Sequence, residues 1–400
     1  MERLFLDNFR GFSEQYIEIR DVNFLVGENS SGKSSVLMAL NTISYPGFWF
    51  KLNFNAGDSQ TFSFDDLVSV ESNNKSYFRI GYFDDRNISF VFEFTNLNGK
   101  PIISSGGIGN TKSAFYFFCE GNQIKHKDFK NENLSLDRLK NFSKKEKSQM
   151  KELVAKSEIN APLMILSLFE KNIFPGKLPI QNITPIAPIR SKPSKTYDEP
   201  GTSENSEGDH IPYVIRRILK TKHDFLQRMK NFGEMSGLFR DINIKEYEEN
   251  VDDAPFRMNF ILNKEPINIV NIGYGVSQIL PVLYTVYTQN NSIITIQQPE
   301  VHLHPKAQAA MGNVFFDLSI GKSKKKFIIE THSDYIIDRF RQTQRKSQTK
   351  SHAQVVFFLR ENGGNKAFSI NIDGNGNYDS DQPEEFRAFF IREKMENLGL

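Results

Sequence analysis

Residues 23–44 read NFLVGENSSGKSSVLMALNTIS, and this stretch decides the fold. An apolar run of buried-strand type, residues 23–26, leads directly into the glycine-rich segment GENSSGKSS, residues 27–35. The spacing of apolar residues then predicts a helix over residues 36–44. A strand, a glycine-rich turn and a helix in this order are the context that a phosphate-binding loop requires.

The glycine-rich segment fits G-x-x-x-x-G-K-[ST] at every fixed position. Glycines let several backbone N–H groups converge on one phosphate, and the helix N-terminus adds partial positive charge. We expect Lys33 to pair with the β and γ phosphate oxygens and the Ser34 hydroxyl to take one magnesium position, so the predicted cofactors are ATP and Mg²⁺. The predicted nucleotide-binding residues of the loop are Gly27, Glu28, Asn29, Ser30, Ser31, Gly32, Lys33, Ser34 and Ser35.

Composition sets the class of protein. The chain has 400 residues, which allows two or three domains or one large domain with insertions. It is 38% hydrophobic with 36 Phe and 13 Tyr, which suffices for a sizeable core and excludes disorder throughout. The net charge of +2 does not point to nucleic acid or membrane. With one cysteine, no apolar run near the roughly 20 residues of a membrane span and no signal-peptide core, we expect a cytoplasmic protein.

A second glycine turn precedes a predicted helix in IVNIGYGVSQILPVL, residues 269–283. Gly273, Gly275, Ser277 and Gln278 are candidate nucleotide-binding residues, because such a turn can present N–H groups to the γ-phosphate held by a neighbouring subunit. An ordinary helix start is the alternative. The order in the chain favours the binding interpretation: this turn follows the phosphate loop and precedes the apolar strand at residues 293–296.

A further predicted strand begins at residue 327 and ends in polar residues, in the segment FIIETHSDYIIDRF, residues 327–340. Ser333 is a predicted N-cap for the following helix. His332, at the end of the strand, is a candidate sensor that hydrogen-bonds the γ-phosphate.

Together these three motifs and the apolar strand at 293–296, which runs into QQPEVHLHP (297–305), resemble the ABC-type ATPase heads of the SMC and RecF kind. They are more similar to compact bacterial ATPases related to the OLD family, including PtuA-like ATPases of anti-phage defence systems. PEVHLHP, IIETHS and NFRGF carry the closer resemblance, and APIRSKP (187–193) and GDHIP (208–212) look like further pieces of it. The resemblance implies an α/β fold: an ABC-type P-loop head with a mixed β-sheet, interrupted by an α-rich lid or arm insertion. It also implies a homodimer or higher oligomer.

In such heads the strand before PE-x-HLHP ends in an acid that holds magnesium through water, followed by a glutamate that polarises the attacking water. Here Gln297 and Gln298 occupy these positions. An amide offers magnesium no charge and cannot act as a base at neutral pH. We therefore predict slow or partner-dependent hydrolysis, with Gln297 at the metal position and Gln298, Glu300 and His332 as catalytic candidates. The alternative is that Glu300 only caps the following segment and ATP is a structural ligand.

Three regions follow from this reading: an N-terminal ATPase lobe over 1–96, an insertion over 97–255 and a C-terminal ATPase lobe over 256–400. Within the insertion, residues 97–112 are predicted to be loop, the lysine-rich residues 128–170 to be helical and residues 191–212 to be flexible.

The leading functional hypothesis is an ATP-binding sensor or clamp of a bacterial anti-phage complex that controls a separately encoded effector, such as a nuclease. The alternative is a RecF-like or SMC-like ATPase of DNA repair or chromosome maintenance that acts on DNA directly. A third class is a scaffold whose ATP is never hydrolysed. Basic residues between 322 and 350 leave direct contact with nucleic acid open, against a solvated helix face.

Overall fold

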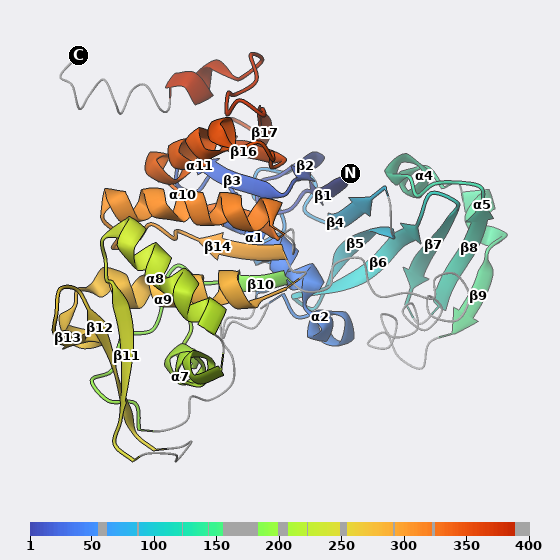
Figure 1. Cartoon of the computed structure of the whole chain (residues 1–400). Coiled ribbons are helices and arrows are strands. Elements are labelled where there is room, and N and C mark those ends of the chain that lie inside the picture. Colours follow the sequence, from blue (N-terminus) through green and yellow to red (C-terminus); the bar gives the residue numbers. More distant parts are fainter. Residues whose placement is uncertain are drawn as a thin grey trace. The chain divides into compact units, whose positions relative to one another are not determined.

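Figure 1 shows the computed structural model of the chain, which consists of two compact units. Unit 1 comprises Met1–Ile19, Gly27–Ile183 and Val356–Ser369, and unit 2 comprises Arg20–Val26, Thr184–Val355 and Ile370–Leu400. The structure describes residues 1–54, 62–85, 88–121, 123–142, 144–154, 183–198, 207–221, 223–248, 254–290, 293–321 and 325–388. Each unit is described by itself below.

Unit 1 is built on an eight-stranded sheet with the order β2-β1-β4-β5-β6-β7-β8-β9, whose neighbouring strands all pair antiparallel. β4 and β5 pair antiparallel over much of residues 77–97. The strands are β1 (Glu2–Asp7), β2 (Gln15–Ile19), β4 (Tyr77–Asp84), β5 (Ser89–Leu97), β6 (Lys100–Gly109), β7 (Ser113–Glu120), β8 (Gln123–Lys130) and β9 (Lys151–Val154).

Aromatic side chains attach the first helices of unit 1 to this sheet. The Trp49 ring lies 5.5 Å from the Phe90 ring and 5.3 Å from the Phe92 ring of β5, between ring centroids. The Trp49 indole N–H donates to the carbonyl of Ile43 at 2.9 Å, so α2 is also fixed to the end of α1. The helices are α1 (Lys33–Ser44), α2 (Pro46–Lys51), α3 (Phe64–Leu67), α4 (Leu136–Lys140) and α5 (Lys144–Ser148). The helix predicted over 36–44 is thereby confirmed.

Strands occupy much of the stretch predicted to be loop or helix, and this corrects the α-rich description of the insertion. Residues 100–130 form β6, β7 and β8. The glycines that suggested a loop lie inside β6, where a Cβ on Gly106 would come within 2.5 Å of the Phe92 ring and 2.7 Å of the Phe117 ring. Their small size therefore makes room for aromatic rings of the neighbouring strands. Of the lysine-rich segment, residues 131–154 contain α4, α5 and β9, and residues 155–182 lie outside the described part of the chain.

A six-stranded sheet carries the candidate motifs of unit 2, in the order β10-β14-β15-β3-β16-β17. β14, β15 and β3 run parallel, so their carboxyl ends lie at one edge of the sheet. Their cores are apolar and buried, as the sequence predicts for parallel strands. The strands are β3 (Val22–Gly27), β10 (Ile183–Ile186), β14 (Ile293–Gln297), β15 (Lys326–Glu330), β16 (Ala353–Glu361) and β17 (Gly364–Ile372).

Helices α10 (Pro305–Ile320) and α11 (Asp334–Lys346) lie side by side in unit 2. A Cβ on Gly312 would lie 2.4 Å from the Ile336 carbonyl oxygen, so only glycine permits this close approach. Phe340 of α11 packs on Phe24 of β3 with ring centroids 5.3 Å apart. The predicted α/β fold class with a mixed sheet is confirmed.

Among the described residues, unit 2 also contains helices between residues 211 and 288 and a small sheet. Two helices of this unit are α7 (Ile211–Thr221) and α8 (His223–Ser236). A three-stranded antiparallel sheet, β11 (Asp241–Glu246), β12 (Phe256–Ile261) and β13 (Pro266–Asn268), leads through a short 3-10 turn into α9 (Tyr274–Thr288). In the described ranges, no helix is both long and apolar enough to cross a membrane. The division of the chain at residues 96 and 255 stays a prediction.

Candidate functional site

The phosphate loop of unit 1 joins β3 to α1, and its glycines are sterically required. Gly27 has φ 146°, and a Cβ there would lie 2.2 Å from the Phe358 carbonyl oxygen. Gly32 has φ 102° and precedes the first residue of α1, where a Cβ would lie 2.5 Å from the Phe12 ring. A side chain at either position would force the loop out of this conformation. The loop therefore has the strand–turn–helix context that the sequence predicts.

Lys33 is directed back over this loop. Its side chain is 4% exposed, and Nζ donates to the carbonyl oxygens of Gly27 at 2.8 Å and Glu28 at 2.6 Å. The Ser31 hydroxyl also donates to the Glu28 carbonyl, at 2.7 Å. The ammonium group is thus held in the loop rather than in open solvent. Glu28, Asn29, Ser30 and Ser34 are exposed, which leaves the outer rim of the loop accessible.

In unit 2 the chain turns sharply where β14 ends. Gln297 is in register with Glu330 of β15, and the Gln298 N–H donates to the Glu330 carbonyl at 2.8 Å. Gln298 has φ 44°, in the left-handed region that non-glycine residues rarely adopt. The turn continues with the Leu303 N–H donating to the Glu300 carbonyl at 2.9 Å. Gln297, Gln298 and Glu300 are therefore gathered beside the carboxyl end of β15.

Both carboxylate oxygens of Glu300 accept hydrogen bonds from the turn after β15. Oε2 accepts from the Thr331 hydroxyl at 2.8 Å, and Oε1 accepts from the His332 backbone N–H at 2.7 Å. Thr331 Oγ1 in turn accepts from the Ser333 N–H at 3.0 Å. As expected for an N-cap, the Ser333 hydroxyl accepts from the Ile336 N–H, at 3.3 Å. Glu300 and His332 are thus brought together, and the partners of Glu300 lie in the turn after β15 rather than in the segment that follows Glu300.

Arg190 is a residue of this site to which the sequence assigned no role beyond its place in APIRSKP. It is only 2% exposed, and its Nη2 donates to the carbonyl oxygens of Gln297 at 2.8 Å and Gln298 at 3.3 Å. Nε and Nη1 are buried and have no hydrogen-bond partner within the described ranges. Burial lowers the pKa of the guanidinium to about 10, against the opposing effect of Glu300. A buried cation therefore lies directly behind the two glutamines.

The glycine turn before α9 places its four candidate residues in different surroundings. Gly273 is exposed, and a Cβ on it would meet no atom within 4 Å. A Cβ on Gly275 would lie 2.6 Å from the His302 carbonyl oxygen. Ser277 and Gln278 are buried: the Ser277 hydroxyl donates to the Tyr274 carbonyl at 2.7 Å, and Gln278 Nε2 donates to the Arg190 carbonyl at 3.4 Å.

The exposed side chain at the start of α9 is that of Tyr274. It is 40% exposed, and its ring centroid lies 4.8 Å from that of His302. Of the four predicted residues, Gly273 is open to another molecule, and the remaining three contact their own chain.

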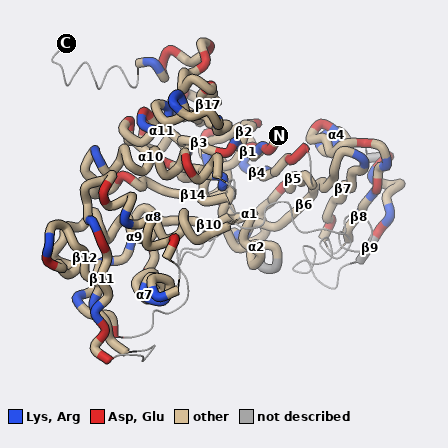
Figure 2. The backbone as a smooth tube through the Cα atoms, viewed as in Figure 1, with Lys and Arg blue, Asp and Glu red and all other residues tan. Residues whose placement is uncertain are grey.

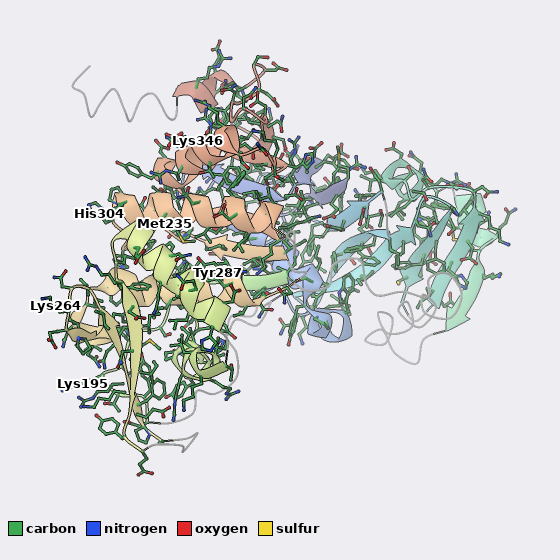
Figure 3. All side chains as sticks on the ribbon, viewed as in Figure 1. Lys195, Met235, Lys264, Tyr287, His304 and Lys346 are labelled. Carbon is green, nitrogen blue, oxygen red and sulfur yellow. The ribbon has the colours of Figure 1, made fainter. Side chains whose placement is uncertain are left out.

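The two histidines of PEVHLHP have local structural roles. His302 has φ 63° and its ring meets Tyr274 edge-on. His304 Nδ1 accepts from the Lys306 N–H at 3.3 Å and caps α10 (Figure 3). Across the described ranges, no group of three or more His, Cys, Asp or Glu could hold a metal ion.

Basic residues on and near α11 are partly engaged within unit 2 (Figure 2). Arg341 Nε donates to the Gly376 carbonyl at 2.8 Å, and Arg345 Nε donates to the Asn375 carbonyl at 2.9 Å. These two arginines hold the loop at residues 373–377, which weakens the case for a stripe of phosphate-binding cations. Residues 322–324 lie outside the described part of the chain.

Unit 2 also contains a cavity of about 1080 Å³ lined by residues of α8, α9 and α10, with Met235 and Tyr287 among them (Figure 3). The buried Lys325 lines this cavity, and its Nζ donates to the Val286 carbonyl at 2.5 Å. Burial, together with the smaller effect of the nearby Arg228, lowers the pKa of Lys325 to about 8.

Comparison with known proteins identifies a family. The model of the family described as "AAA domain, putative AbiEii toxin, Type IV TA system" matches residues 22–338. No curated protein matches the chain.

Solved SMC heads have a similar arrangement. The SMC head domain from Thermotoga maritima is 12% identical, with 92% of this chain and 98% of that chain covered and a TM-score of 0.39. An SMC head bound to the C-terminal winged-helix domain of ScpA is 11% identical, with coverage of 92% and 98% and a TM-score of 0.45. An SMC head with an extended coiled coil, bound to the C-terminal domain of ScpA derived from Pyrococcus furiosus, is 11% identical, with coverage of 99% and 100% and a TM-score of 0.41.

Proposed function

The chain belongs to this AAA family, and from that membership we propose that it binds ATP and hydrolyses it slowly or only with a partner. The observation that carries the proposal is the phosphate loop between β3 and α1. Its two glycines adopt conformations that other residues cannot replace, and Lys33 is directed into the loop. This arrangement supports binding of a nucleotide phosphate by backbone N–H groups and one ammonium group.

Slow hydrolysis follows from the chemistry of the strand end. Gln297 and Gln298 cannot act as bases at neutral pH. Each carboxylate oxygen of Glu300 accepts a hydrogen bond from the Thr331–His332 turn, so this carboxylate is held by the protein in the position of a structural acceptor. We therefore assign His332 the role of γ-phosphate sensor and Glu300 the role of positioning that turn.

The family description, which names a toxin of a toxin–antitoxin system, supports a role in defence. Together with the PtuA-like motifs PEVHLHP and IIETHS, it favours an ATP-binding sensor or clamp that controls a separately encoded effector, such as a nuclease. In this proposal ATP binding brings two copies of the chain together, and Gly273 and Tyr274 at the exposed start of α9 meet the nucleotide of the partner.

ATP binding is tested by isothermal titration calorimetry of wild-type protein and Lys33→Ala. Wild-type protein should bind ATP, and Lys33→Ala should lose at least a factor of about 30 in affinity, roughly 2 kcal/mol, because it removes a phosphate-binding charge. Lys264→Ala, an exposed lysine in unit 2, is the matched control. Circular dichroism shows whether Lys33→Ala keeps its fold. Absence of ATP binding by wild-type protein would remove the proposal.

Association is tested by sedimentation velocity with and without ATP. Tyr274→Glu should bind ATP normally but fail to assemble with it, because the added charge lies where a second copy and its phosphates are proposed to approach. Tyr247→Glu, at another exposed tyrosine, should assemble as wild type does. Gly275→Val is a poor test, because its side chain would collide with His302 of the same chain. Equal assembly of all proteins with and without ATP contradicts the trans arrangement.

The effector is tested by co-expressing the chain with the genes that neighbour its own. A co-purifying nuclease whose activity changes with ATP supports the clamp. ATP-dependent binding of gapped DNA by the isolated chain favours the alternative of a repair ATPase.

A further inference from the structure

The residues at the end of β14 do not fit a magnesium ion, although membership in an AAA family implies general use of ATP with Mg²⁺. Magnesium is bound in proteins by carboxylate, phosphate and water oxygens. Here the two residues at that position are amides, Gln297 and Gln298. The nearest carboxylate in sequence, Glu300, already accepts hydrogen bonds on both oxygens. The strand end thus offers a divalent cation no uncommitted carboxylate from the 297–300 turn.

In heads with acids at these two positions, the metal balances their negative charge. Here the positive charge beside the strand end belongs to Arg190. Arg190 Nη2 is 2.8 Å from the Gln297 carbonyl oxygen, and the side chain is almost completely buried. A guanidinium carries its charge at all physiological pH values, and a cation in a site of low dielectric repels a second cation and attracts an anion. Its buried Nε and Nη1 make no hydrogen bond within the described ranges, so two donors of this cation are left without an acceptor.

Glu330 is the one further acid that must be weighed. It is in register with Gln297 on the neighbouring strand, and residues in register project from the same face of a sheet. It is 6% exposed, which places its carboxylate in the interior of the unit. A metal held by Glu330 instead of Gln297 would be a relocated magnesium site, and the experiment below separates that arrangement.

We infer that this chain binds a nucleoside triphosphate without a divalent cation at the end of β14. Arg190 supplies there the positive charge that magnesium supplies in related ATPases. The inference rests on the proposed function, since it requires that the strand end faces the phosphates of ATP. It concerns binding and charge, and it assigns Arg190 an electrostatic role through the 297–298 turn.

The first experiment measures ATP affinity of wild-type protein by calorimetry in excess MgCl₂ and in excess EDTA. The two dissociation constants should agree within about threefold, because the end of β14 provides no ligand for the metal. A loss of tenfold or more in EDTA overturns the inference. Absence of ATP binding under both conditions instead contradicts the proposed function, so the two failures are distinguishable.

Variants of the strand end provide the second experiment. Arg190→Gln should weaken ATP binding about tenfold in both MgCl₂ and EDTA, and Arg190→Lys should retain most of the affinity because it keeps the charge. Gln297→Asp in the Arg190→Gln background should create magnesium-dependent binding, since it restores an acid and removes the cation. Thermal unfolding of each variant identifies any that does not fold, and the wild-type comparison remains decisive in that case.

Glu330→Gln is the control for a relocated metal. It should leave the agreement between MgCl₂ and EDTA unchanged. Wild-type binding that depends on magnesium and becomes independent of it in Glu330→Gln would place the metal on β15 and overturn the inference.

Discussion

Replacing Glu300 by alanine tests whether this carboxylate positions the turn after β15 or is kept for hydrolysis. The substitution removes the acceptors of the Thr331 hydroxyl and the His332 N–H. His332 is exposed, so its N–H regains a bond from water at little cost. Thr331 is fully buried, and a buried donor that loses its acceptor costs about 1–3 kcal/mol. We expect Glu300→Ala to lower the free energy of unfolding by about 2 kcal/mol.

The assay is urea unfolding followed by circular dichroism, with thermal unfolding as a second measurement. A loss of about 2 kcal/mol corresponds to a fall of roughly 4–8 °C in Tm for a cooperative unit of about 150–250 residues. Glu300→Gln should lose less than about 1 kcal/mol, because its amide keeps one acceptor and the Thr331 hydroxyl can reorient. Glu265→Ala, an exposed acid in the turn between β12 and β13, is the control and should change stability by under about 0.5 kcal/mol. If Glu300→Ala unfolds like this control, the positioning role is wrong.

Three further outcomes follow from features of the two units. Lys325→Met should stabilise the protein relative to wild type at pH 7.5 and less so at pH 10, measured by urea unfolding. The unfolded lysine titrates near 10.5 and the folded one near 8, so wild-type stability rises between these values while the variant stays flat; a pH-independent difference contradicts this. Gln298→Gly should unfold at equal or higher temperature than wild type, because glycine adopts φ 44° without strain; a loss above about 1 kcal/mol would show that the glutamine side chain holds the turn. Gly106→Val should lower the free energy of unfolding by about 1–3 kcal/mol or more in the same assay, because its side chain would meet the rings of Phe92 and Phe117. Gly374→Ala, whose Cβ would make only ordinary contacts, should not lower it.

The sequence predicts the local parts of this site well, because their causes are local. The loop at 27–35, the helix after it and the cap at Ser333 depend on glycine conformation, apolar spacing and hydrogen bonds within a few residues. The sequence leaves Glu300 with two possible roles, a catalytic carboxylate or a structural cap, because its hydrogen-bond partners are 31 and 32 positions away. Sequence spacing contains no information about such a bond.

Long-range packing explains the features that were missed. Arg190 bonds to residues 107 and 108 positions away, and an arginine beside prolines looks like an ordinary exposed loop residue. The glycines of β6 have the composition of a loop, and only the rings of Phe92 and Phe117 show that they belong to a sheet. A composition of this kind becomes interpretable once the neighbouring strands are known.

The path of the chain between the two units has a consequence for how the protein is made. Unit 1 needs residues 356–369, and unit 2 needs residues 20–26, so neither is complete until most of the chain has left the ribosome. Within unit 2, the Asn23 side chain donates to the Phe327 carbonyl across 304 positions. Such distant pairings make folding slow, and the apolar strand β3 must wait, unpaired, through most of synthesis. The nascent protein should therefore depend on a chaperone that shields β3.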